Sequence, residues 1–62
     1  MLELMKEEEA ANVLRLKADT LKRWRLMGRG PAFYRLGGAI RYRLSDIEIF
    51  LNNSHKNGER GA

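Results

Sequence analysis

The apolar residues of the sequence change their spacing once, at the segment Gly28-Arg29-Gly30-Pro31, and this change limits the folds open to the chain. Before the segment, apolar residues recur every three or four positions, which is typical of helices. After it, residues 32–44 form two short runs rich in aromatic and aliphatic residues, which favour strands. Glycine commonly follows the last residue of a helix and proline cannot continue one, so the segment ends a helix. With 62 residues, the chain is predicted to form one small α+β domain with a thin core.

Two short helices joined by a tight turn are predicted before this break. Residues 7–14 begin with three glutamates, which are favourable at the positive end of a helix dipole, and continue with an apolar stripe. Residues 15–17 form the turn, and residues 18–27 form the second helix. Leu21 and Trp24 are three positions apart and therefore share one face of this helix.

A β-hairpin is predicted for residues 32–44, with Gly37-Gly38 as its two-residue turn. Counting outward from the turn gives the cross-strand pairs Phe33–Tyr42, Tyr34–Arg41 and Arg35–Ile40. Successive side chains of a strand point to opposite faces, so one face belongs to the core and the other to solvent or a ligand. The core face is assigned Phe33, Ile40 and Tyr42, and the other face Tyr34, Arg41 and Arg43.

A third helix is predicted over residues 46–52, introduced by a capping box with Ser45 at the N-cap and Glu48 three residues later. Its apolar face comprises Leu44, Ile47, Phe50 and Leu51. The following residues have no periodicity and are rich in Gly, Asn and charge, which indicates a flexible tail. The predicted division is a folded domain, residues 1–53, and a tail, residues 54–62.

The positive charge is concentrated in the middle of the chain. Residues 15–43 carry nine Lys and Arg against Asp19 alone, for a net charge of +8, whereas residues 1–14 carry −3 and residues 44–62 carry −1. Solubility does not require such a concentration, while binding to a polyanion does.

The order of helix, tight turn, basic helix, hairpin and helix is typical of a winged helix-turn-helix. Its recognition helix needs an apolar face toward the core and a cationic or small polar face toward the major groove. The candidate core anchors are Leu14, Leu21, Trp24, Phe33, Tyr42 and Phe50. The candidate recognition-helix contacts are Lys17, Thr20, Lys22, Arg23 and Arg25. The candidate wing contacts are Tyr34, Arg35, Arg41 and Arg43.

Several of these residues have a structural alternative. Arg25 could pair with a glutamate of the first helix, and Arg35 could support the hairpin instead of contacting DNA. Tyr34 could be a phosphate donor or an ordinary exposed strand residue. Trp24 is assigned to the core, with stacking on a base as the alternative.

The chain resembles the excisionase and AlpA-type small DNA-binding proteins of phages, integrative elements and plasmids, which have MerR-like winged helix-turn-helix folds. The resemblance covers about residues 4–52 and rests on "EAA..L" at 9–14, "TLKRWR" at 20–25, "GRGPAFYRLGGAIRY" at 28–42 and "SDIEIFL" at 45–51. The family usually has Gly or a small residue where this chain has Arg15, and a Ser or Thr N-cap where it has Lys17.

The resemblance implies a sequence-specific DNA-binding accessory factor. As an excisionase it would bind and bend attachment-site DNA to promote excision by an integrase, and the alternative is an AlpA-like transcription regulator. Double-stranded DNA is the expected partner, bound by several copies, and an integrase is a candidate second partner. The expected location is the cytoplasm, on the nucleoid. From a different class of function, a small basic adaptor for an acidic protein stays open.

Other functions are disfavoured by the residues that the chain lacks. It has no cysteine, its one histidine lies in the predicted tail, and it offers no paired carboxylates for catalysis. No enzyme activity, small-molecule substrate, cofactor or metal is therefore expected. No apolar run is long enough to span a membrane, and no sheet with exposed aromatic residues favours RNA.

Overall fold

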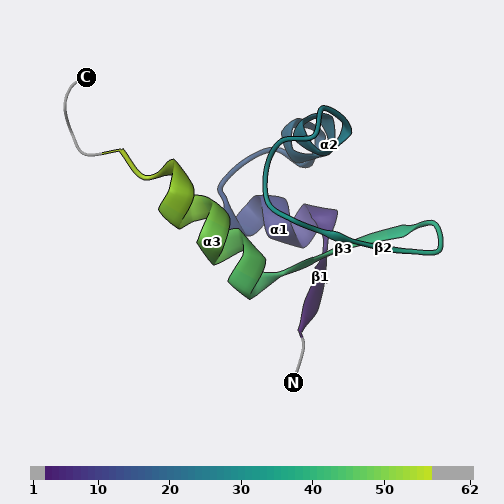
Figure 1. Cartoon of the computed structure of the whole chain (residues 1–62). Helices are drawn as coiled ribbons and strands as arrows, with labels where there is room; N and C mark the ends of the chain where they lie inside the picture. The colour runs from purple at the N-terminus through teal and green to yellow at the C-terminus, as the bar shows by residue number, and fades with distance from the viewer. Residues whose placement is uncertain (1–2, 57–62) are drawn as a thin grey trace.

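A computed structural model describes residues 3–56 of the chain, and the arrangement of its elements is shown in Figure 1. The elements, in order, are β1 (Leu4–Lys6), α1 (Glu7–Val13), α2 (Ala18–Leu26), β2 (Tyr34–Leu36), β3 (Ala39–Arg43) and α3 (Leu44–Ser54). The β2–β3 hairpin projects from the body beside α1 and α2, and α3 extends in the opposite direction (Figure 1). The predicted α+β class and the order of a winged helix-turn-helix are confirmed.

The sheet has three antiparallel strands in the order β1-β3-β2, whereas the sequence predicts a hairpin of two. The additional strand is β1, which pairs with β3 in the register Leu4–Arg43, Met5–Tyr42 and Lys6–Arg41. A two-stranded hairpin is marginal in water, and a third strand is one of the features that stabilise it. With only three residues, β1 is too short to show an alternating pattern, so its strand conformation comes from pairing with β3.

The predicted register of the hairpin is confirmed. Tyr34 pairs with Arg41 and Arg35 with Ile40, and Gly37 has a φ of +63° that glycine adopts readily. Phe33 lies just before β2, yet its ring centroid is 6.1 Å from that of Tyr42.

The core is small and lies between α1, α2, the sheet and α3. Its fully buried members are Ala10, Ala11, Leu21, Tyr42 and Ile47. Among the predicted anchors, Leu21 and Tyr42 are fully buried, whereas the other four are half-buried. Leu14, Trp24 and Phe33 pack against the buried cluster, and Phe50 lies with its ring centroid 5.9 Å from that of Trp24. So short a chain has too little volume to enclose all its large side chains.

The beginning of α3 differs from the predicted capping box. The helix begins at Leu44 with Arg43 at its N-cap, so Ser45 lies inside the first turn and caps nothing. Instead, the Arg43 guanidinium donates to both oxygens of Asp46, from Nη2 at 2.9 Å and from Nε at 3.2 Å. The prediction of Ser45 and Glu48 as a capping box is therefore wrong. The helix begins before Ser45, and the ion pair between Arg43 and Asp46 spans its first turn.

The apolar face and the end of α3 also differ from expectation. Ile47 is buried and Phe50 half-buried, but Leu44 and Leu51 are 43% and 47% exposed and do not belong to the core. The helix continues to Ser54, which is the first residue of the predicted tail. Residues 57–62 of that tail lie outside the described residues.

The turn between α1 and α2 places a bulky residue in the left-handed region. Arg15 has a φ of +59°, while the backbone N–H of Leu16 donates to the Ala11 carbonyl at 2.8 Å and fixes the turn. A residue with a Cβ pays about 1–2 kcal/mol in this conformation, which glycine avoids. The turn therefore has the conformation that suits a glycine, and this chain adopts it with the strain of an arginine at position 15.

We expect Arg15→Gly to raise the free energy of unfolding by about 0.5–1 kcal/mol, because relief of the strain exceeds the entropy lost by glycine. Chemical denaturation measures this change. Lys17→Gly is the matched control. Because Lys17 has an ordinary φ of −75°, glycine relieves no strain there and this variant should be less stable than the wild type. A lower denaturation midpoint for Arg15→Gly would show that the turn does not require a positive φ in solution.

Candidate nucleic-acid interface

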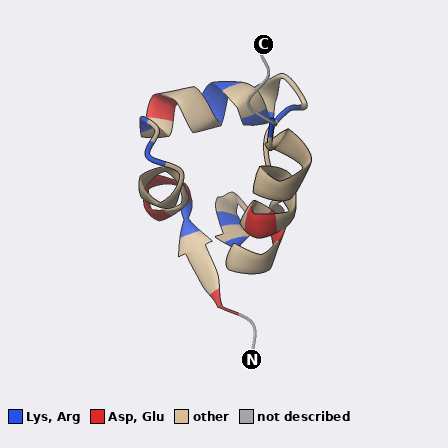
Figure 2. Ribbon diagram, turned by 90° about the vertical axis from the view of Figure 1, so that its left-hand side faces the viewer, with Lys and Arg blue, Asp and Glu red and all other residues tan. Residues whose placement is uncertain are grey.

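The solvent-facing side of α2 forms one continuous stripe. Asp19, Lys22, Arg23 and Leu26 are exposed, whereas Leu21 on the other side is completely buried. Asp19 precedes the pair Lys22 and Arg23 by three and four positions, and Leu26 follows the pair by four and three, so all four share one face of the helix. The basic residues along α2, and an acidic residue near one of its ends, can be seen in Figure 2. Lys17 is exposed at the N-cap, and Thr20 is half-buried beside the stripe. Sequence reasoning named Lys22 and Arg23 but missed Asp19 and Leu26, which the helical period places beside them.

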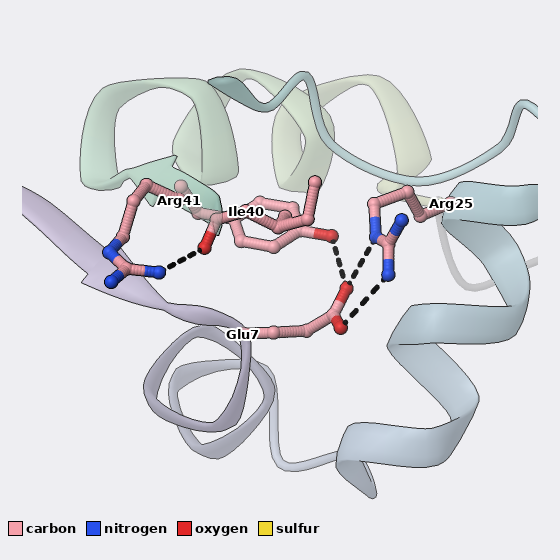
Figure 3. A network of polar contacts seen from close by, with 5 residues as sticks. Glu7, Arg25, Ile40 and Arg41 are labelled. Carbon is pink, nitrogen blue, oxygen red and sulfur yellow. Dashed lines mark hydrogen bonds and ion pairs between the residues drawn. The ribbon is translucent and has the colours of Figure 1, made fainter. Parts of the chain in front are cut away.

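Arg25 is turned into the protein and forms an ion pair with Glu7 (Figure 3). Its Nε and Nη2 donate to the Glu7 carboxylate at 2.8 and 3.3 Å, and the Tyr42 hydroxyl donates to Glu7 Oε2 at 2.9 Å. The side chains of Arg25 and Glu7 are only 10% and 19% exposed. The alternative of a pair with a glutamate of the first helix is confirmed, and Arg25 is withdrawn as a candidate DNA contact.

This network shifts the pKa of each of its three members toward the protonation state that its hydrogen bonds require. Hydrogen bonds from the Arg25 guanidinium, and one from Tyr42, keep the pKa of Glu7 below its ordinary value despite partial burial. The hydrogen bond to Glu7 in turn raises the pKa of Arg25. Burial, together with the hydrogen bond to Glu7, raises the pKa of Tyr42. The phenol therefore stays protonated and can donate, so α1, α2 and β3 are joined by a charged contact.

The cations of the wing are divided between the two faces of the sheet. Arg35 pairs with Ile40 on the face that carries Tyr42, and its guanidinium carbon lies 5.8 Å from the centroid of the Phe33 ring. Because the Tyr42 hydroxyl contacts Glu7 of α1, this is the face turned toward the helices. Arg35 therefore lies on the helix side of the hairpin, where its side chain is exposed.

Arg41 and Arg43 lie on the opposite face of the sheet and are half-buried. Arg41 Nη1 donates to the carbonyl of Ile40 at 2.8 Å, as Figure 3 shows. The Arg43 guanidinium is held by Asp46, which raises its pKa, and its central carbon lies 5.9 Å from the centroid of the Tyr34 ring. Arg43 is therefore partly committed to internal contacts, whereas Arg41 keeps its charge unpaired by any acid among residues 3–56.

The third strand adds a cation that the sequence did not indicate. Pairing of β1 with β3 places Lys6 directly beside Arg41, on the same face of the sheet, and Lys6 is exposed. Tyr34 flanks Arg41 from the other side, so the three side chains form a row across the sheet. No local signal in the sequence could have shown this, because the row depends on a pairing between distant segments.

An open hollow of about 180 Å³ lies beside α2, lined by Trp24, Arg29, Gly30 and Phe50. Between residues 3 and 56, no group of acidic, histidine or cysteine side chains is arranged to hold a metal ion. Within the same range, no helix combines the length and the apolar character needed to cross a membrane.

The sequence profile of the helix-turn-helix domain family matches residues 4–55. No curated protein matches the chain at a significant level. The matched segment includes every element of the described structure, from β1 to α3. By its sequence and its fold, the chain belongs to the helix-turn-helix domain family.

Proposed function

We propose that the protein binds double-stranded DNA in a sequence-specific manner, with α2 in the major groove and the hairpin as a wing. The observation that carries this proposal is the exposed stripe of α2, in which Lys22 and Arg23 face solvent opposite the buried Leu21. In a helix-turn-helix, the second helix enters the groove and its first residues contact base edges.

The candidate contacts have different chemical tasks. Arg23 can donate two hydrogen bonds to guanine O6 and N7, and Lys22 can contact guanine or a phosphate. Lys17 lies at the beginning of α2, where the backbone approaches a phosphate in many such complexes, and Thr20 lies next to the stripe. On the wing, Arg35, Arg41, Arg43 and Tyr34 are proposed phosphate contacts, joined by Lys6.

The salt dependence of binding tests this proposal. If five phosphates are contacted, log K should fall with log salt at a slope of about −4.5. Arg41→Ala should make the slope shallower by about 1. Arg23→Ala should weaken binding to a specific duplex by about 1–3 kcal/mol and affect a random duplex much less. Fluorescence anisotropy measures each quantity.

Lys56→Ala is the matched control, because Lys56 lies beyond α3 and outside the proposed interface. It should leave the slope unchanged. An unchanged slope for Arg41→Ala would remove that residue from the interface, and equal losses on both duplexes would make Arg23 a phosphate contact. Affinity for an acidic protein without any salt-dependent DNA binding would favour the adaptor function.

The more specific role that we propose is that of an excisionase. The helix-turn-helix family to which the chain belongs includes excisionase and AlpA-like proteins, and the sequence motifs resemble theirs. A single small domain makes few base contacts, and bending a site of 20–30 base pairs costs about 1–6 kcal/mol. We therefore propose that several copies share one attachment site on the nucleoid, where they bend the DNA and promote excision by an integrase.

Circularly permuted duplexes measure the bend, and an excision assay with an integrase measures the direction of recombination. We expect bent DNA in the multiply occupied complex and more excision than integration. Straight DNA with changed promoter activity would instead support the AlpA-like transcription regulator.

A further inference from the structure

One acidic side chain lies within the exposed stripe of α2, and the proposed function does not use it. Asp19 is the only acidic residue between positions 15 and 43, and it precedes Lys22 and Arg23 by three and four positions. It is exposed, and among residues 3–56 its carboxylate takes part in no ion pair. Its place in the first turn is favourable for the helix dipole, but any exposed position in that turn would serve this purpose.

A carboxylate on a DNA-facing surface has opposite effects on the backbone and on the bases. It is repelled by phosphates, so it lowers affinity for DNA of any sequence. In the major groove, however, an aspartate can accept a hydrogen bond from the N4 amino group of cytosine. Asp19 is the second residue of α2, and the first residues of a recognition helix are those that reach base edges.

Resting on the proposed DNA binding, we infer that Asp19 is a specificity-determining residue that accepts a hydrogen bond from cytosine N4 in the major groove. The stripe then presents a hydrogen-bond acceptor at Asp19 and donors at Lys22 and Arg23. The acceptor contacts the amino group of a cytosine, and the donors contact acceptor atoms of neighbouring bases. The same carboxylate weakens binding to DNA of other sequences. It therefore increases discrimination between sequences in two ways, by a hydrogen bond to the correct base pair and by repulsion from DNA that lacks this pair.

Parallel selections from a randomised duplex library test this inference, using the wild-type chain, Asp19→Asn and Asp19→Ala. Asparagine pairs with adenine N6 and N7, so Asp19→Asn should change one selected C·G pair to A·T. Asp19→Ala should lose its preference at that pair and bind random duplexes more tightly. On the wild-type duplex, replacing this C·G pair should weaken wild-type binding about fivefold or more, and Asp19→Ala binding hardly at all.

Glu48→Gln is the control for charge, because Glu48 is an exposed acid of α3 and lies off the stripe. It should select the wild-type sequence. The inference is overturned if Asp19→Asn selects the same sequence as the wild type. It is equally overturned if the variant loses a guanine preference next to the C·G pair instead, since Asp19 would then only position Arg23. If the wild-type chain itself selects no duplex, the proposed DNA binding fails, which is a different result from unchanged preferences.

Discussion

Replacing Trp24 by alanine is expected to unfold the chain. The indole is half-buried, packs against the core cluster and lies with its ring centroid 5.9 Å from that of Phe50. It is therefore the aromatic link between α2 and α3. Removing such a ring costs about 3–5 kcal/mol. A domain of this size has a total stability of about 3–5 kcal/mol, so little would be left. Circular dichroism and thermal unfolding measure the loss.

Trp24→Phe is the control, because it keeps a ring beside Phe50 and should remain folded with reduced stability. The result that contradicts this expectation is a folded Trp24→Ala chain that has selectively lost DNA affinity. In that case the indole would stack on a base, and the hollow lined by Trp24, Arg29, Gly30 and Phe50 would belong to the interface.

Removing the Glu7 carboxylate is expected to cause the second largest loss of folding stability, after the loss of the Trp24 ring. In Glu7→Ala, the mostly buried Arg25 guanidinium keeps its charge without a partner, and the Tyr42 hydroxyl loses its acceptor. Removing one member of a buried charged pair costs about 3–5 kcal/mol, and we expect about 2–3 kcal/mol because Glu7 is 19% exposed. Urea denaturation of Glu7→Ala, Arg25→Met and the double variant measures this cost. The double variant should be more stable than the sum of the single losses predicts.

The same network predicts a loss of stability in acid. The pKa of Glu7 is lowered in the folded state, chiefly by the hydrogen bonds from Arg25, so protonation favours the unfolded chain. The stabilisation is fully present above about pH 4.3, the ordinary pKa of a glutamate, and is lost as the pH falls further. Glu7→Gln should have a flatter stability profile in this range. Parallel profiles for the two chains would mean that the ion pair does not form in solution.

Local signals predicted much of the fold. Gly37-Gly38 fixed the hairpin register because a two-residue turn permits one pairing only, and Gly28 marked the end of α2. β1 escaped prediction because its strand conformation depends on β3, which is more than thirty residues away. The predicted start of α3 was wrong. Ser45 is a typical N-cap residue, and the sequence pattern did not reveal that Arg43 would take the N-cap position and pair with Asp46.

The candidate site was predictable where it depends on helical period. Leu21 is buried, and the helical period of about 3.6 residues then turns Lys22 and Arg23 away from the core, where both are exposed. The role of Arg25 could not be decided in advance, since its partner Glu7 is eighteen residues away and only the packing of α1 on α2 brings them together. The row formed by Lys6, Arg41 and Tyr34 depends on the third strand in the same way.

Because β3 is the central strand of the sheet, the two helices α1 and α2 are not expected to fold as an isolated fragment. A fragment ending before residue 39 would contain α1 and α2, but β1 would have no strand to pair with and Glu7 would lack the Tyr42 hydroxyl. The recognition helix is thus held in place by residues that follow it in the chain. Folding must close the long loop between β1 and β3, so the domain is expected to form as one cooperative unit with no stable half.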